Sequence, residues 1–305
     1  LCSGGYVASD FHLVRAYPRK MLKWGYFPAT KYWDGQKKAE FLDKHKEGTV
    51  SLMWAGRFID WKHPELPVLL AEYLKEKGYA FHLSMVGGGE MEEEIRQMIT
   101  EKGLEEEVTL CGYLPPEKVR EMMEKTEVYL FTSDYKEGWG AVLNEAMNSG
   151  CAVLASHAIG AVPFLLKHGE NGIVFESGNL RDMEEKAELL LKDAGRRRKL
   201  GEAACETIAR EWNAEKAADR LVELAGRLTE TESAHGACGR DGTEEEVEPA
   251  GTGDRNSRQK RIGTLQDVEE LAYAEGPLSM AEVISPGKMF ERLMNRSGKI
   301  SCGEI

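Results

Sequence analysis

Six short apolar runs alternate with amphipathic stretches between residues 50 and 175, and this alternation constrains the fold more than any other feature of the chain. The apolar runs are predicted to be buried strands over residues 50–55, 81–86, 108–111, 128–131, 152–155 and 173–175. Helical spacing lies between them, over residues 65–77, 90–102, 116–125, 140–149 and 162–168. Strands connected by helices form parallel sheets with right-handed crossovers. The sequence therefore predicts an α/β fold with a doubly wound, six-stranded, parallel Rossmann-like sheet.

Composition separates the 305 residues into three parts. Residues 49–228 hold the alternating pattern and three further predicted helices, over 179–193, 196–211 and 214–228. Residues 1–48 carry nine basic and five acidic side chains, whereas residues 229–305 carry nine basic and fifteen acidic ones. Residues 229–260 are rich in Gly, Glu, Thr and Ser, so we expect a largely disordered acidic tail. Two short helices are predicted in it, over 265–273 and 281–294, weakly ordered rather than docked on a partner.

Composition also excludes several classes of protein. The net charge of −12 argues against a dedicated nucleic-acid binder, which carries a basic patch. The six cysteines include no Cys-x-x-Cys pair, a spacing that suits neither a disulfide scaffold nor a zinc site and is typical of a reducing cytosol. The most apolar stretch, residues 151–166, is shorter than the roughly 20 residues that a bilayer requires. We expect a cytoplasmic protein without a transmembrane segment.

Charged residues and glycines follow the first two predicted strands, and ligands of a doubly wound sheet bind beyond the carboxyl ends of its strands. Arg57 and Lys62 follow the first strand, after Gly56, and a planar fork with a point charge suits a diphosphate. On spacing alone, the simpler interpretation is two solvated surface cations. Glycines 87–89 follow the second strand and let backbone approach an anion closely. A tight strand-to-helix turn explains these glycines equally well, because Met91 and Glu92 interrupt the dinucleotide-binding fingerprint.

The most informative segment is residues 132–147, which follows the fourth strand. A helix is predicted to begin near Gly140, and its first N–H groups form an anion site with a dipole charge of about +0.5. Glu137 precedes this helix and Glu145 lies inside it, so one carboxylate can reach a sugar while the other accepts hydrogen bonds from ribose hydroxyls. An acid that favours the helix dipole would explain Glu137 but not the whole segment.

Together these motifs resemble the C-terminal donor-binding domain of GT-B glycosyltransferases, most closely the retaining family-4, group 1 type with its Glu-x7-Glu motif. The resemblance covers about residues 50–228. It rests on Gly56-Arg57 with Lys62, the glycines at 87–89, Gly112, Glu137-Gly-Trp-Gly with Glu145-Ala-Met, Gly150 and Trp212. One position departs from the family pattern, because Phe164 stands where the family often has the Glu of Gly-Gly-x-Pro-Glu.

The resemblance implies a role for each matched residue. Arg57 and Lys62 would bind the diphosphate of a nucleotide-sugar, Glu137 would contact hydroxyls of the donor sugar, and Glu145 would contact the ribose. Backbone N–H groups of residues 139–142 would hold sugar and phosphate oxygens. The implied catalytic residues are Glu137, Arg57 and Lys62, and the implied donor-binding residues are Gly56, Gly88, Gly112, Tyr113, Gly138, Trp139, Gly140, Ala141, Val142 and Glu145. Gly112 and Tyr113 would lie near the base.

The resemblance also implies an activity. We expect retaining transfer of a sugar from a UDP- or GDP-sugar to a hydroxyl of a glycan or a lipid-linked acceptor, in glycan or polysaccharide biosynthesis. Cations and helix N–H groups would stabilise the departing diphosphate, so we expect no metal and no cofactor. An alternative is a nucleotide-sugar-binding module or subunit without transferase activity. A GT-B-shaped epimerase or phosphorylase is a third, although a phosphorylase needs a pyridoxal-binding lysine motif that is not seen.

Residues 1–48 look like the closing strands of an N-terminal acceptor domain followed by a linker. Because the chain begins at Leu1 without a methionine, we expect a complete donor half and a truncated acceptor half. The basic charge of these residues suits peripheral contact with an anionic membrane that bears a lipid-linked acceptor. A solvated face is the simpler interpretation of the same charge.

Overall fold

A six-stranded parallel sheet forms the centre of the protein. In the computed structural model, residues 1–17, 20–236, 268 and 272–296 are described. The strands are β3 (Val50–Ala55), β4 (Phe81–Val86), β5 (Val108–Gly112), β6 (Val128–Phe131), β7 (Ala152–Ser156) and β8 (Ile173–Phe175). Their order is β5-β4-β3-β6-β7-β8, and each neighbouring pair is parallel. The predicted doubly wound sheet is therefore confirmed.

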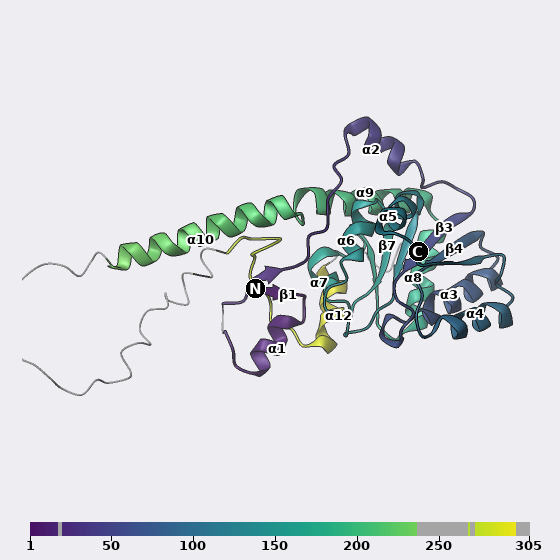
Figure 1. Cartoon of the computed structure of the whole chain (residues 1–305), viewed down its shortest axis with the longest axis horizontal. Coiled ribbons are helices and arrows are strands. Elements are labelled where there is room, and N and C mark those ends of the chain that lie inside the picture. Colours follow the sequence, from purple (N-terminus) through teal and green to yellow (C-terminus); the bar gives the residue numbers. More distant parts are fainter. Residues whose placement is uncertain (18–19, 237–267, 269–271, 297–305) are drawn as a thin grey trace, which may run out of the picture.

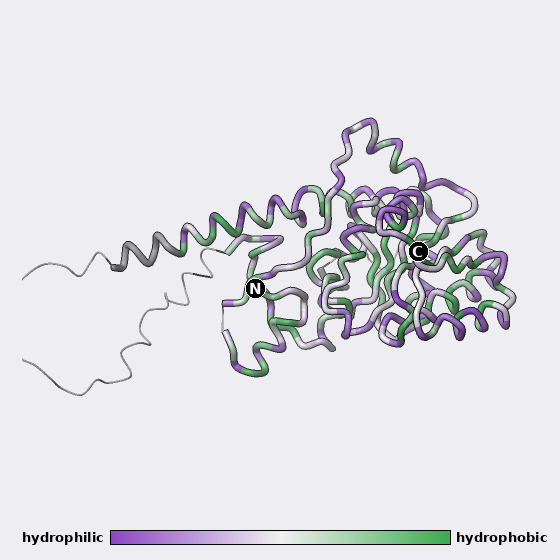
Figure 2. Tube along the Cα trace, in the orientation of Figure 1, coloured by the Kyte–Doolittle hydropathy of each residue, from purple (hydrophilic) through white to green (hydrophobic). Residues whose placement is uncertain are grey.

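Helices cover both faces of this sheet (Figure 1). They are α3 (Glu65–Glu76), α4 (Glu92–Glu101), α5 (Pro116–Lys125), α6 (Val142–Asn148), α7 (Val162–Leu165), α8 (Leu180–Leu191), α9 (Ala194–Arg210) and α10 (Ala214–Gly236). Apolar side chains of successive strand residues enter two different cores, with Leu52 and Trp54 on one side of the sheet and Met53 on the other. The residues of β6, β7 and β8 are all buried, which explains why these strands are almost continuous apolar runs in the sequence, and Figure 2 shows hydrophobic residues at the centre of the body.

The strand order places a switch point between β3 and β6. From β3 the chain builds outward to β4 and β5, and then returns to the other side of β3 to build β6, β7 and β8. The connections after β3 and β6 therefore run in opposite directions across the sheet, which opens a crevice at the carboxyl ends of these two strands. Both of the charged segments predicted from the sequence begin at this crevice.

The N-terminal residues form a small unit of their own. Strands β1 (Cys2–Ser3) and β2 (Lys23–Trp24) pair in parallel through the helix α1 (Val7–Leu13). Helix α2 (Gly35–Leu42) then contacts α9, and Lys38 forms an ion pair with Glu206 at 2.7 Å. The domain boundaries at residues 48 and 228 stay predictions.

The C-terminal segment packs against the rest of the chain, and this differs from the sequence-based expectation. Residues 278–281 pair with residues 21–23, since Lys23 N donates to Ser279 O at 2.9 Å and Ala281 N donates to Met21 O at 2.8 Å. Helix α12 (Pro286–Arg296) buries Met289 and Leu293 in the core on the α6 side of the sheet. The expectation of a weakly ordered helix over 281–294 was therefore wrong, because its apolar residues contact a core formed by distant parts of the chain.

Most of the segment between α10 and residue 272, for which disorder and a helix were predicted, lies outside the described residues. Residues 229–236 continue α10 rather than leaving the helix at residue 228, whereas the remainder of the predicted disordered segment, residues 237–260, lies outside the described residues. Most of the predicted helix over 265–273 lies outside them as well. Within the described residues, every helix is too short or too polar to cross a bilayer.

Candidate functional site

An open cleft lies at the carboxyl ends of β3, β4, β5 and β6, at the switch point of the sheet. Eight of the thirteen residues predicted for the site line it: Gly56, Arg57, Lys62, Tyr113, Glu137, Gly140, Ala141 and Val142. The other lining residues are Ala55, Val86, Gly87, Leu114 and Val119. The cleft therefore combines two cations, one carboxylate and an apolar wall.

Lys62 and Glu137 are brought into direct contact in this cleft. Their side chains form an ion pair and are only 14% and 13% exposed. The hydroxyl of Ser133 donates to the same Glu137 carboxylate oxygen at 3.2 Å. Because a partly buried charge needs a partner, Lys62 and Glu137 stabilise each other's charge in the cleft.

A polar side chain at the end of β6 fixes the segment that carries Lys62. The short 3-10 helix η1 (Asp60–Lys62) follows β3, and the Thr132 hydroxyl donates to Lys62 O at 2.7 Å. Thr132 in turn accepts a hydrogen bond from the indole N–H of Trp54 at 2.9 Å. This buried chain of hydrogen bonds joins the connections that follow β3 and β6. Neither Thr132 nor Ser133 was predicted for the site, although two hydroxyl residues directly after an apolar strand were a usable signal.

Arg57 supplies an exposed cation at the mouth of the cleft. Its guanidinium lies 5.7 Å from the centre of the Trp61 ring, and Lys62 Nζ lies 5.0 Å from the same ring. Among the described residues Arg57 has no carboxylate partner. A guanidinium held over an aromatic ring with its N–H groups unpaired is suited to a phosphate.

Backbone N–H groups are available next to these cations. Within the described residues, the N–H groups of residues 138–142 donate to no acceptor, whereas Glu137 O and Trp139 O accept from Gly160 N at 2.9 Å and Ala161 N at 3.1 Å. The turn of residues 137–141 is therefore attached to residues 160 and 161 through its carbonyl oxygens and not through its N–H groups. Gly140 has φ +82, and a Cβ at this position would lie 2.7 Å from Phe131 Cε1. This conformation places the first residue of α6 at Val142, two residues later than predicted, and the N–H group of Val142 has no acceptor among the described residues and is available to an anion.

The remaining predicted residues lie around the cleft rather than in its lining. Gly88 contacts the ring of Tyr113, where a Cβ would lie 2.8 Å from Tyr113 Cε2, and Gly112 O accepts from Gly87 N at 2.8 Å. The Trp139 side chain is 3% exposed and donates to Asn144 Oδ1 at 3.0 Å, so only its backbone is left for a ligand. Gly138 stands in the turn described above.

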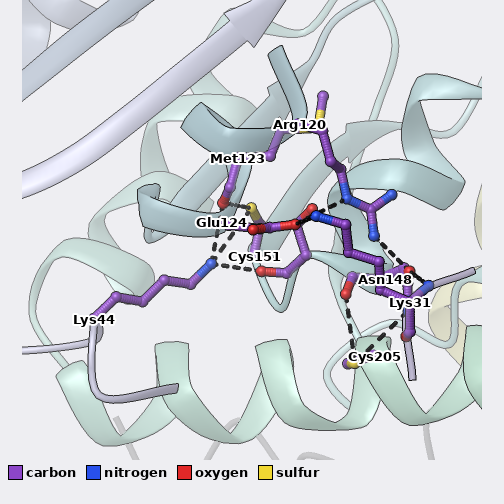
Figure 3. A network of polar contacts seen from close by, with 9 residues as sticks. Lys31, Lys44, Arg120, Met123, Glu124, Asn148, Cys151 and Cys205 are labelled. Atoms are coloured by element: carbon purple, nitrogen blue, oxygen red, sulfur yellow. Dashed lines mark hydrogen bonds and ion pairs between the residues drawn. The ribbon is translucent and has the colours of Figure 1, made fainter. Parts of the chain in front are cut away.

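Glu145 is half-buried on α6 and does not line the cleft. Burial raises the pKa of its carboxyl, and the nearby charge of Arg120 opposes this. Figure 3 shows Arg120 in a polar network in which Lys31 and Lys44, from the segment before β3, reach α5 and the end of α6. Lys44 Nζ donates to Ser149 O at 2.6 Å. The segment that joins the N-terminal unit to the sheet is thereby attached to the helices beside the cleft.

A protein-family model and several curated proteins match this chain. The family model for glycosyl transferases group 1 matches residues 36–207, which is more than half of the chain. The N-acetyl-alpha-D-glucosaminyl L-malate synthase of Bacillus anthracis is 31% identical over 134 residues, covering 44% of this chain and 34% of that protein. The chain spans less than half the length of the first curated relatives that it matches.

Solved structures share the fold. A TarM variant of S. aureus, solved with fondaparinux, α-GlcNAc-glycerol and UDP, has a TM-score of 0.58 at 22% identity over 70% of this chain and 41% of that one. The C-terminal domain of the group 1 glycosyl transferase LpcC from Francisella tularensis has a TM-score of 0.51 at 22% identity, over 60% of this chain and 96% of that one. In the part of the chain that is described, no group of three His, Cys, Asp or Glu side chains is placed to hold a metal ion.

Proposed function

Because the chain belongs to the glycosyl transferases group 1 family, we propose that it holds the donor site of a retaining glycosyltransferase. The reaction moves a sugar from a UDP- or GDP-sugar to a hydroxyl of a glycan or lipid-linked acceptor. In this proposal residues 49–228 form the donor domain, and the location is cytoplasmic.

One observation carries the proposal: Arg57, Lys62 and residues 140–142, whose N–H groups have no acceptor among the described residues, line one cleft. A departing nucleoside diphosphate carries negative charge that develops in the transition state. Preorganised cations and N–H dipoles stabilise such charge without reorganising. When the diphosphate binds, Lys62 exchanges the Glu137 carboxylate for phosphate oxygens, and this exchange releases Glu137 to accept hydrogen bonds from the donor sugar.

Titration calorimetry with UDP-GlcNAc, UDP-glucose and GDP-mannose tests the site. Lys62→Ala is expected to weaken binding about 10- to 150-fold, since a charge-assisted contact contributes about 1.5–3 kcal/mol. Lys75→Ala is the matched control, because Lys75 lies near the end of α3 and contacts Glu107 and Gly103 O, away from the cleft. Equal affinity of the wild type and Lys62→Ala for all three donors would refute the assignment.

An assay with radiolabelled donor and a mixed acceptor pool tests the reaction. A labelled product whose anomeric configuration matches that of the donor, by NMR, is the expected result. A product of inverted configuration would contradict the retaining mechanism. Donor binding without any product would favour the nucleotide-sugar-binding module instead.

A further inference from the structure

His63 adopts a backbone conformation that residues with a Cβ rarely use. Its φ is +50, in the left-handed region, directly after the Lys62 that lines the cleft. Such a conformation costs free energy at any residue other than glycine, and these outliers cluster at functional sites. Such a conformation persists only where the surrounding structure compensates for it, and the contacts of the His63 side chain can supply that compensation.

The imidazole of His63 lies between two carboxylates that come from different elements. Its Nδ1 lies 2.8 Å from Glu65 Oε1, at the start of α3, and its Nε2 lies 3.8 Å from Asp134 Oδ2, in the connection after β6. The second oxygen of Glu65 is buried and has no hydrogen-bond partner among the described residues. A carboxylate with so few partners gains most from a charged imidazolium.

Asp134 connects this contact to the turn that carries Glu137. Asp134 N donates to Trp61 O at 2.9 Å, and Asp134 O accepts from Glu137 N at 3.1 Å. Its carboxylate also accepts from Lys136 N at 2.7 Å. A shift of Asp134 would therefore also move the turn that carries Glu137. His63 directly follows Lys62 in the chain, so the contact between His63 and Asp134 connects the two cleft residues Lys62 and Glu137.

We propose that His63 is a positioning residue whose imidazolium binds Glu65 and Asp134 and so holds the Lys62 and Glu137 halves of the cleft in the arrangement that binds the donor. The inference rests on the proposed function, because it concerns the donor affinity of the same cleft. Deprotonation of His63 removes the attraction to Asp134. The hydrogen bonds of Thr132 and Asp134 and the Lys62–Glu137 and Lys136–Asp60 ion pairs still join the two connections, so the expected effect on donor affinity is moderate.

The charges around His63 favour its protonated form. The hydrogen bond to Glu65 raises the pKa of the imidazole, with further contributions from Asp134 and Asp60, while partial burial opposes them. Of the nearby cations, Lys62 pairs with Glu137 and Lys136 pairs with Asp60 at 3.4 Å. A raised pKa means that the stabilising charge is present at low pH and is lost as the pH rises through the pKa of the folded state.

The test is the pH dependence of donor binding between pH 5.5 and 8.5, measured by calorimetry with UDP-GlcNAc, UDP-glucose and GDP-mannose. These donors are used because their diphosphate diesters do not titrate in this range. The wild-type affinity is expected to fall about two- to fivefold with rising pH, in keeping with a partly exposed ion pair. His63→Gln is expected to bind at the weaker level throughout, and His63→Lys at the stronger level throughout. His82→Gln, which removes a histidine of β4 that contacts Thr109, is expected to keep the wild-type profile.

The variants separate a positioning role from a structural one. His63→Gly relieves the backbone conformation and is expected to fold, as checked by circular dichroism, yet to lose the pH dependence. A wild-type profile in His63→Gln or His63→Gly would overturn the inference while leaving the proposed function intact. Absence of binding by the wild type to any of the three donors would instead refute the proposed function.

Discussion

Gly87 offers a direct test of how closely the backbone is packed beneath the cleft. It has φ +124, and a Cβ at this position would lie 3.0 Å from the carbonyl carbon of Gly56 and nearer still to its oxygen. An alanine there must therefore adopt a conformation almost reserved for glycine and must also displace the backbone that leads to Arg57. The conformation costs about 1–3 kcal/mol, and overpacking costs a similar amount. We expect Gly87→Ala to lower the free energy of unfolding by about 2–6 kcal/mol.

Gly78→Ala isolates one of these two costs. Gly78 follows α3 with φ +76, but a Cβ there would meet nothing within 4 Å. Its substitution is expected to cost only the conformational part, about 1–2 kcal/mol. Urea denaturation followed by circular dichroism measures both variants, and calorimetry with the three nucleotide-sugars measures the cleft. Gly87→Ala is expected to weaken donor binding and Gly78→Ala to leave it unchanged. Equal losses of stability in the two variants would refute the reasoning, because crowding against Gly56 would then cost nothing.

Two further predictions concern stability. Arg197 is fully buried, pairs with Glu127 at 3.0 Å and donates to Leu190 O at 2.6 Å. Arg197→Ala is expected to lower the free energy of unfolding by about 3–5 kcal/mol, measured by urea denaturation, because it leaves a buried carboxylate without its cation. A loss below 1 kcal/mol would contradict this. Burial lowers the pKa of His168 from 6.5 to about 4, and its Nδ1 accepts from Val174 N at 3.0 Å. The unfolded state then binds the proton more tightly, so the free energy of unfolding should fall as the pH falls from 6.5 towards 4, and less steeply in His168→Asn. Parallel pH profiles of the two proteins would show that His168 is not responsible.

The strands could be predicted from the sequence almost residue by residue. Each of the six apolar runs is followed by a polar residue or a glycine, and in β6, β7 and β8, whose residues are all buried, the apolar run itself is the signature of the strand. The position of Arg57, Lys62 and Glu137 at one edge followed from the rule that parallel strands all end on the same side. Helix ends were harder to predict from the sequence, because they depend on local backbone conformation. The φ of +82 at Gly140, for example, moves the start of α6 to Val142.

Contacts between distant segments could not be predicted in this way. The Lys62–Glu137 ion pair and the pairing of residues 278–281 with residues 21–23 join positions that no local pattern relates. The sequence predicts no role for His63, because its partners Glu65 and Asp134 meet it only when two connections of the sheet are brought together. Sequence periodicity reports which face of an element is buried, but it carries no information about the element on the other side.

Phe164, which stands where the family often has a Glu, also makes contacts with distant segments that no local pattern predicts. Its ring stacks on Trp212 at 6.0 Å between ring centres, lies 6.2 Å from the Trp139 ring, and is covered by Lys23 Nζ at 5.5 Å. A glutamate in this place would lack the ring that stacks on Trp212. The Trp139 ring also packs against the segment that leaves β2, since a Cβ on Gly25 would lie 2.8 Å from it. Phe164 thus supplies aromatic packing that joins the N-terminal unit to Trp139, the residue that directly precedes the cleft-lining Gly140.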